Sequence, residues 1–323
     1  MSITPLMPES SPLSYTVVGH QGGDRARPPV LPFSVVLLHR SNRFDRADIF
    51  DMAHRLNALE IISVETVNPR YDLEAFCKAY REIRFLVFQE APSSWGEAIN
   101  IAISEARGEY VFVMWSDTQL LPVSRGWYDS HIQNKPLCTV PFFRTTSGTN
   151  LPTLSVPVSF RKGLKILHVV PGGEQKASLY AFDYVGLFNR DGFLQTTGFD
   201  PLIRESYWQC LDYGLRAWLW GSSIRVSSSL RVQISADLVA EDTNPGPGYE
   251  RFYARNLLVD FMADHGILAW RRFFRYRKAS GSGFFQALSH FKAHRQWVHS
   301  HRYRFRTEAR SIQELWEEPE VQG

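Results

Sequence analysis

Residues 95–117, WGEAINIAISEARGEYVFVMWSD, contain the pattern that decides the fold. Apolar residues recur at helical spacing in the first half of this stretch, which predicts a helix over 95–106. We expect Gly108 to close that helix in a left-handed conformation. Residues 110–115 then form an unbroken apolar run, as in a strand buried on both faces, and an aspartate, Asp117, follows it closely.

The same alternation extends toward the N-terminus. Short apolar runs predict strands over 33–38, 60–65 and 84–88, and the segments between them, 45–59 and 72–83, have helical spacing. This order indicates an α/β fold with a mostly parallel, twisted sheet and helices on both faces. Because ligands of such sheets bind outside the carboxyl ends of the strands, the informative residues should directly follow the strands.

The second half of the chain is less regular, and it shows no internal repeat. Turn residues and apolar runs still divide it into elements. We predict strands over 136–143, 166–170, 179–188 and 223–233, helices over 204–220 and 249–265, and a loop over 192–201.

The residue composition and the positions of Pro and Gly predict the domain organisation. Residues 1–31 are rich in Pro, Ser and Gly and are interpreted as a flexible arm, followed by a main domain over 32–268 and an extension over 269–323. No apolar run reaches the roughly 18 residues of a membrane span, and the first residues lack a signal-peptide pattern. Three cysteines without metal-type spacing fit a reducing compartment. We therefore expect a cytoplasmic protein.

The formal net charge of +3 conceals an uneven distribution. Residues 271–310 hold eleven Lys and Arg against a single acid, Glu308, and aromatic residues are interleaved with them. The favoured interpretation is a helical subdomain whose cations cover buried rings. A second is an anionic membrane surface bound through residues 270–310 on the cytoplasmic face, and nucleic acid ranks last.

Four segments, taken in order, resemble a known enzyme family: residues 35–42, 60–68, 95–117 and 197–221. They resemble the family 2-type nucleotide-diphospho-sugar glycosyltransferases, which have the GT-A fold. The resemblance implies a GT-A-like, mostly parallel twisted sheet flanked by helices, here with a helical basic C-terminal extension. It also implies a nucleotide-binding half over 32–122 and an acceptor half over 123–268. The implied reaction moves a sugar, with inversion, from a nucleotide-diphosphate donor to a glycan or lipid-linked acceptor.

A divalent cation, Mn or Mg, is implied by the resemblance. Such an ion neutralises the charge that develops on the leaving diphosphate. The family places an apolar–Asp–x–Asp sequence at this point, and here its register falls on residues 114–117, with Trp115 in place of the first aspartate. Asp117 is thus the candidate metal ligand, and the alternative for it is a turn residue. The family's late histidine has no counterpart here; Asp237 and Glu241 are nearby acids.

A general base must deprotonate the acceptor hydroxyl. The family's Glu-Asp pair falls on Gln209 and Cys210, neither of which is a base of the usual kind. Glu205 and Asp212 are the nearest substitutes, and helical spacing puts them on one face. The alternative, weighed equally, is that Asp212 forms a structural ion pair with Arg216 at i,i+4.

The resemblance also assigns a nucleotide pocket. Glu65, which ends the second strand, would contact the base, and the turn from His39 to Asn42 would line the same pocket. Asn100 matches a family position near the nucleotide, with a solvated helix face as its alternative. Gly96, near a helix N-terminus, would let backbone N–H groups approach an anion.

Two hypotheses of different class follow from these departures. The first is an active glycosyltransferase with an atypical metal site or base. The second is a catalytically impaired relative that binds a nucleotide sugar or glycan, or serves as a scaffold, because fold alone does not fix function.

Overall fold

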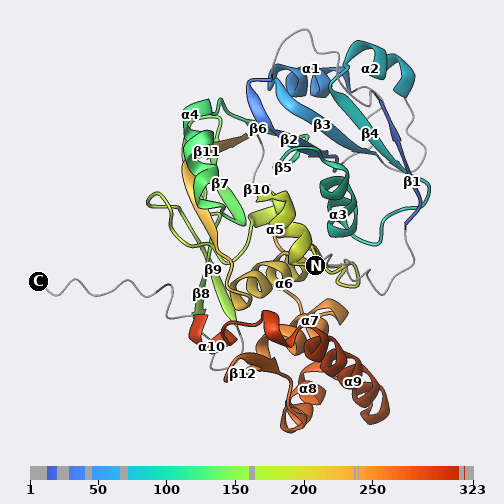
Figure 1. Ribbon diagram of the computed structural model, residues 1–323, viewed down its shortest axis with the longest axis vertical. Coiled ribbons are helices and arrows are strands. Elements are labelled where there is room, and N and C mark those ends of the chain that lie inside the picture. The colour runs from blue at the N-terminus through green and yellow to red at the C-terminus, as the bar shows by residue number, and fades with distance from the viewer. Residues whose placement is uncertain are drawn as a thin grey trace, which may run out of the picture.

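A computed structural model describes residues 13–19, 29–40, 46–65, 72–159, 164–235, 238, 240–312 and 316. Helices and strands alternate through its first half, and helices dominate its end (Figure 1). The strands are β1 (Tyr15–Val18), β2 (Leu31–Leu38), β3 (Ala58–Glu65), β4 (Ile83–Phe88), β5 (Tyr110–Trp115), β6 (Thr118–Leu120), β7 (Cys138–Thr145), β8 (Leu154–Ser159), β9 (Lys165–Val169), β10 (Gly186–Asn189), β11 (Ile224–Ile234), β12 (Asp260–Met262) and β13 (His265–Ile267). The helices are α1 (Ala47–Arg55), α2 (Leu73–Ala79), α3 (Trp95–Glu105), α4 (Arg125–His131), α5 (Arg190–Gln195), α6 (Ser206–Leu219), α7 (Pro247–Phe252), α8 (Phe273–Ser280), α9 (Phe284–Ser300) and α10 (Ala309–Ile312).

The shorter helical turns complete the element order. They are η1 (Ile132–Asn134), η2 (Phe182–Tyr184), η3 (Tyr253–Leu257), η4 (Trp270–Arg272) and η5 (Arg302–Arg304).

A nine-stranded sheet forms the centre of the molecule, in the order β1-β4-β3-β2-β5-β10-β7-β11-β6. The block β4-β3-β2-β5 is parallel throughout, and β10 follows it antiparallel to β5. The predicted α/β class, with a parallel block flanked by helices, is confirmed. The reason is local: the central strands β2 and β5 are mostly apolar and buried on both faces, so helices must cover both sides.

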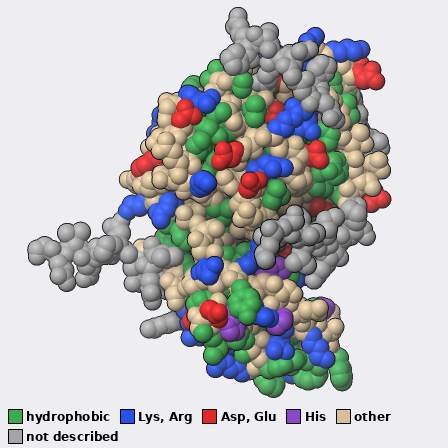
Figure 2. Space-filling view, in the orientation of Figure 1, with side chains coloured by type: hydrophobic (Ala, Val, Ile, Leu, Met, Phe, Trp, Pro, Cys, Tyr) green, Lys and Arg blue, Asp and Glu red, His purple; other side chains and the backbone are tan. Residues whose placement is uncertain are grey.

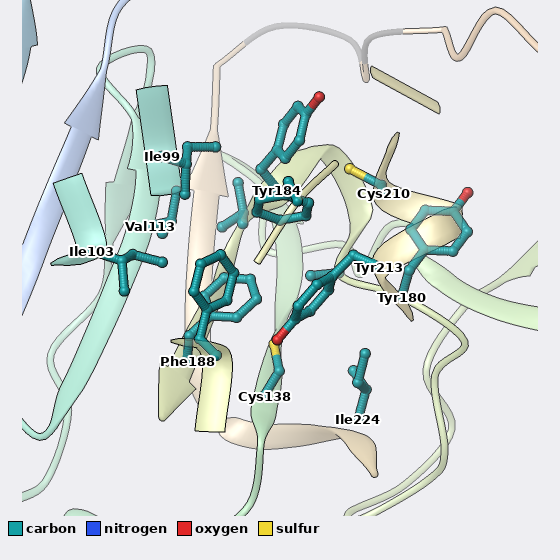
Figure 3. Close-up of a cluster of buried hydrophobic side chains, with 14 of the residues drawn as sticks. Ile99, Ile103, Val113, Cys138, Tyr180, Tyr184, Phe188, Cys210, Tyr213 and Ile224 are labelled. Atoms are coloured by element: carbon teal, nitrogen blue, oxygen red, sulfur yellow. The ribbon is translucent and has the colours of Figure 1, made fainter. Parts of the chain in front are cut away.

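Helices lie on the two faces of the sheet, with α1 and α2 on one side of the parallel block and α3 on the other (Figure 1). Helix α6 is buried along nearly its whole length, and it packs between the sheet and the C-terminal elements. A helix that is apolar on most of its surface belongs inside a protein. Aromatic rings fill the space beneath it: Tyr213 lies 6.1 Å from Phe188 and 4.8 Å from Phe199 between ring centroids (Figure 3).

Several predictions for the second half are wrong in an informative way. The predicted strand over 179–188 is a turn up to residue 184, and only Gly186–Asn189 joins the sheet. The predicted helix over 249–265 ends at residue 257, and the hairpin of β12 and β13 follows. Gly108 has no left-handed backbone. Its role is close packing, since a Cβ there would lie 2.7 Å from the backbone nitrogen of Ser34.

Part of the predicted flexible arm is ordered. Residues 15–18 form the edge strand β1, which pairs antiparallel with β4 in the register Tyr15↔Phe88. The alternation of this short segment was too brief to identify it as a strand in the sequence. Residues 1–12 and 20–28 lie outside the described residues.

The basic extension is helical, as predicted. Helices α8 and α9 pack against each other, and α9 also contacts β13 and η3 of the preceding segment. The two helices form the lower lobe in Figure 1. Within the described part of the chain, no helix has the length and apolar character needed to cross a membrane.

Candidate functional site

Three side chains meet where β2 and β5 end. The two strands are paired in register with Leu38 opposite Trp115, so Arg40 and Asp117, which follow them, come to the same edge of the sheet. The Arg40 Nε donates to Asp117 Oδ2 at 3.1 Å. Its guanidinium carbon also lies 3.9 Å from the centroid of the Trp115 ring, within cation–π range.

The turn before β10 brings a second carboxylate to this edge. Because β10 runs antiparallel to β5, its beginning lies beside the end of β5, and Asp183 directly precedes it. Arg40 forms an ion pair with Asp183 through Nη2, with Nη1 at 3.5 Å from Oδ1. The indole nitrogen of Trp115 donates to the carbonyl of Asp183 at 2.9 Å. We call Arg40, Asp117 and Asp183 the strand-edge cluster.

The backbone that carries Asp183 is strained. Asp183 and Tyr184 both adopt positive φ angles, 52° and 64°, which residues other than glycine rarely adopt. The hydroxyl of Tyr184 donates to Gln209 Oε1 at 2.7 Å and fixes the far side of the turn. Strain of this kind persists only where neighbouring contacts hold it, and it concentrates at functional sites.

The electrostatics of Asp183 are unusual for an aspartate. Burial raises its pKa to about 6, against the opposing effect of Arg40, and the carboxylates of Asp117 and Glu241 raise it further. A carboxyl group with such a pKa can exchange a proton near neutral pH. Its side chain is 15% exposed, so a small group can reach it from solvent.

A second polar group borders the cluster. Glu241 accepts a hydrogen bond from the Tyr180 hydroxyl at 2.7 Å, and its Oε2 lies 2.8 Å from Nε2 of His168. The charge of Glu241 acts on both Asp183 and Cys210, which places the three near one another. The carboxylate of Glu241 therefore adds negative charge near Asp183.

The described residues do not fit a divalent metal. No group of three or more His, Cys, Asp or Glu side chains comes together among them in a way that could hold an ion. Asp117, the predicted ligand, is 54% exposed and bound to Arg40, and Asp183 is bound to the same guanidinium. A permanent cation thus already stands between the two carboxylates. Asp237 lies outside the described residues.

Gln209, at the family's Glu position, is a structural amide. It is fully buried, and its Nε2 donates to Ser94 Oγ and to the carbonyl of Asp200, both at 2.8 Å. Its Oε1 accepts from the Tyr184 hydroxyl and from the backbone N–H of Gly96. All four hydrogen-bonding positions of the amide are therefore satisfied. Cys210 beside it is buried, and burial raises the pKa of its thiol.

The predicted bases Asp212 and Glu205 do not meet in one cleft. Asp212 is 2% exposed, lies 3.2 Å from Nη2 of Arg216, and accepts from Asn256 at 2.7 Å. This is the structural ion pair that the sequence left as the alternative. Glu205 instead stands at the N-terminus of α6 and faces backbone, with Gly248 N–H at 3.4 Å from its Oε1. Neither carboxylate joins the strand-edge cluster.

Gly96 and Asn100 are engaged inside the protein. The N–H of Gly96 donates to Gln209 at 2.9 Å, and a Cβ on Gly96 would lie 2.3 Å from that oxygen. The absence of a side chain at Gly96 allows α3 and α6 to pack closely against each other. Asn100 donates to the Phe199 carbonyl at 2.7 Å and accepts from the Phe199 N–H at 2.8 Å, so it clamps the turn at 197–199. The predicted places of Gly96 and Asn100 beside a nucleotide stay predictions.

His39 and Glu65 form a buried polar pair beneath the edge. Glu65 is 1% exposed and accepts from Arg46 Nη1 at 3.1 Å and from Ser63 Oγ at 2.5 Å. His39 Nε2 lies 2.8 Å from Ser63 Oγ, and burial lowers the pKa of its imidazole to about 3. Their predicted contact with a base stays a prediction. Asn42 lies outside the described residues.

Sequence reasoning missed two members of the cluster. Arg40 lay in a turn already chosen for its position after a strand, but its charge was not used. Asp183 was placed inside the predicted strand at 179–188, and a carboxylate in a run of apolar residues was the signal that it lies elsewhere. Its partner Arg40 is 143 positions away, so no local motif could join them.

Comparison with solved structures identifies the fold. A structure of GalNAc-T7 with UDP, GalNAc and Mn2+ matches with a TM-score of 0.54 and 14% sequence identity, over 90% of this chain and 59% of that one. The fold is GT-A-like. TarS of S. aureus matches over 64% of this chain and 37% of its own, with 13% identity and a TM-score of 0.46. The complex of TarS 1–349 with UDP-GlcNAc matches with 13% identity and a TM-score of 0.46, over 69% of this chain and 65% of that one.

The two TarS scores lie below 0.5, so the fold assignment rests on the first comparison. This chain spans 59% of the GalNAc-T7 chain. The chain matches no protein-family model, and no curated protein matches it.

Proposed function

We propose that this protein is a glycosyltransferase that moves a sugar from a nucleotide-diphosphate donor to a hydroxyl group of a glycan or lipid-linked acceptor. The observation that carries the proposal is the strand-edge cluster. It lies at the carboxyl ends of β2 and β5 in a GT-A-like sheet, where open α/β sheets bind their ligands. Charged groups of both signs meet there, as a reaction between a hydroxyl and a diphosphate ester requires.

Each member of the cluster has a role in this proposal. The acceptor oxygen attacks the anomeric carbon, the bond from that carbon to the phosphate oxygen breaks, and the nucleoside diphosphate leaves with the bonding pair. Asp183 takes the proton of the attacking hydroxyl, for which a carboxylate with a pKa of about 6 is suited. Arg40 supplies positive charge to the departing diphosphate, since guanidinium binds phosphate with two parallel hydrogen bonds.

Asp117 positions Arg40 in this scheme. The carboxylate of Asp117 holds Nε, which leaves the Nη atoms to face Asp183 or a phosphate. When a donor binds, its phosphate oxygens compete with the carboxylates for the guanidinium. The single displacement inverts the anomeric carbon.

The donor class is the first thing to test. Thermal melts of the full chain with a panel of nucleoside diphosphates and their sugars, with and without manganese, report binding and metal need together. UDP-sugars come first because the matched GalNAc-T7 structure contains UDP. We expect an upward shift of the melting temperature with one nucleotide, also in the presence of a chelator. No shift with any nucleotide contradicts the proposal.

Turnover is tested by release of the nucleoside diphosphate. Asp183→Asn should abolish release while the nucleotide-induced thermal shift remains, because the amide cannot accept the proton. Wild-type kcat/KM should rise with pH through about 6, where Asp183 loses its proton. Asp117→Asn should reduce release. Asp129→Asn is the matched control, since Asp129 is 51% exposed and also bound to an arginine.

Retention of full turnover by Asp183→Asn would remove Asp183 from the mechanism. A pH profile flat between about 5 and 7 would do the same, because the proposed base titrates there.

A binding protein without turnover is the second candidate. The full internal engagement of Gln209, at a family base position, and of Asp212, a predicted substitute, favours it. Nucleotide binding without release from any donor, in the presence of candidate acceptors, selects this function.

A further inference from the structure

The structure divides the aromatic residues of the basic extension into two sets. Phe273, Tyr276 and Phe291 are buried in the contact between α8 and α9. Phe274 and Phe285, in contrast, are 72% and 85% exposed. Rings of this size are normally covered in a soluble protein, so two such exposures near one another indicate a surface with a partner.

The exposed rings are linked through the buried ring of Phe273. Phe274 packs on Phe273 at 5.7 Å between centroids, Phe273 on Phe284 at 5.6 Å, and Phe284 on Phe285 at 5.6 Å. Phe284, at 44% exposed, bridges the buried and the exposed rings. We call Phe274, Phe284 and Phe285 the aromatic tip. Phe284 and Phe285 begin α9 directly after the turn, and Phe274 lies at the start of α8, joined to them through Phe273.

The turn between α8 and α9 has a regular backbone structure. Helix α8 ends at Gly281, whose φ of 65° is a left-handed C-cap, and α9 begins at Phe284. The backbone of Ala287 bonds to Gly283 and closes the first turn of α9. The turn that precedes Phe284 and Phe285 therefore has a defined backbone.

Positive charge predominates near the tip, although Glu250 of α7 reaches the hairpin through hydrogen bonds with Tyr276 and Ser282. Residues 266–307 contain no acidic residue. Arg271 and Arg272 are bound to Asp260, but Arg275 and Lys278 are exposed and have no ion-pair partner among the described residues. Arg277 stacks over the ring of Phe284 at 5.5 Å. Figure 2 shows hydrophobic and Lys/Arg side chains side by side over the lower lobe.

We propose that the aromatic tip inserts into the interface of an anionic phospholipid bilayer, with Arg275, Arg277 and Lys278 on the headgroups. Phenylalanine has no polar atom to satisfy, so it suits the boundary between headgroups and acyl chains, and basic residues add attraction to anionic lipid. Exposed phenylalanine rings beside basic residues suit a bilayer interface better than a nucleic acid strand, which basic proteins usually bind along a groove. This inference does not rest on the proposed enzymatic function.

The test uses the full chain and sedimentation with vesicles. One set is phosphatidylcholine alone, and the other contains about 30% phosphatidylserine, at about 0.1 M salt, where attraction to a surface still extends about 10 Å. We expect binding to the anionic vesicles only, weakening as salt rises. The double variant Phe274→Ser/Phe285→Ser should lose at least about a hundredfold in partitioning, since two rings that become buried on insertion each contribute more than about a factor of ten.

A matched control separates the tip from general hydrophobicity. Leu167 and Val170, in and after β9, are 51% and 50% exposed, so Leu167→Ser/Val170→Ser removes apolar surface elsewhere on the molecule. This control should bind vesicles as the wild type does. Equal melting temperatures of wild type and both double variants would show that the fold is intact.

Three outcomes overturn the proposal. One is equal binding of the tip variant and the wild type to anionic vesicles, and another is no binding of the wild type to either vesicle. The third is binding of a fluorescent oligonucleotide that depends on the aromatic tip while anionic vesicles do not compete, which assigns the surface to nucleic acid.

Discussion

Gln209→Glu tests whether the family's base position has become part of the scaffold. The substitution keeps the shape of the side chain and replaces Nε2 with an oxygen. Ser94 can rotate its hydroxyl to donate to that oxygen, but the carbonyl of Asp200, 2.8 Å away, can only accept. In the variant, an ionised carboxylate would therefore face a carbonyl in a fully buried position. A protonated carboxyl group can donate to the carbonyl and restore the network.

The expected loss of stability is the free energy needed to keep the new carboxyl group protonated in the folded state at a given pH. An unfolded glutamate has a pKa near 4.3, and each pH unit above it costs about 1.4 kcal/mol if the folded state keeps the proton. The cost is about 1 kcal/mol at about pH 5 and about 4 kcal/mol at about pH 7.5. Because the folded-state pKa is raised, stability is lost as pH rises from about 4.3 through the folded pKa.

Urea unfolding and thermal melts of wild type and variant at the two pH values provide the measurement. We expect nearly equal stability at the lower pH and a melting temperature lower by about 10 °C at the higher one. Gln133→Glu, on an exposed turn, is the matched control and should be neutral at both. A variant as stable as wild type at both pH values refutes the buried network. A gain of turnover would place residue 209 in the reaction cleft.

Two further predictions concern the buried polar groups. Burial lowers the pKa of His39 and His294 to about 3 and of His301 to about 4, so unfolded histidine binds protons that the folded protein does not. Stability is then complete above about pH 6.5 and falls below it, by about 2 kcal/mol per histidine at about pH 5. His294→Gln should recover that amount in urea unfolding, and an unchanged pH dependence contradicts the assignment. Asn100→Ala removes both bonds to the backbone of the turn at 197–199 and should cost about 2 kcal/mol in the same assay; a loss below about 0.5 kcal/mol would show that the clamp is not needed.

The first half of the fold could be predicted because its signals are local. A buried strand such as Tyr110–Trp115 is a run of apolar residues, and the helix before it has its own spacing and an N-cap at Ser94. The turn at Asp183 could not be predicted in this way. Its positive φ angles are stabilised by Trp115 and Gln209, which come from other parts of the chain. Contacts made at long range leave no periodic trace in the sequence.

For the candidate site too, the sequence predicted the positions of residues better than their roles. Asp117 was found because it follows a recognisable strand, and the structure keeps it at the sheet edge beside Arg40. Asp212 was found by register with two equally weighted roles, and the structure shows it in the ion pair with Arg216. Register fixes where a side chain lies along a helix, whereas its role depends on what another element brings to it.

The departures from the family pattern belong to one connected structure. Gln209 links α3 to α6 through Gly96, binds the carbonyl of Asp200, and holds the hydroxyl of Tyr184. Tyr184 is the neighbour of Asp183 in the strained turn, so the amide that replaces a family acid also supports the carboxylate that we propose as the base. If this is correct, Gln209→Ala should disturb the strand-edge cluster without touching it. The pH at which turnover is half-maximal would then move downward, because a loosened turn exposes Asp183 to water and relieves the burial that raises its pKa.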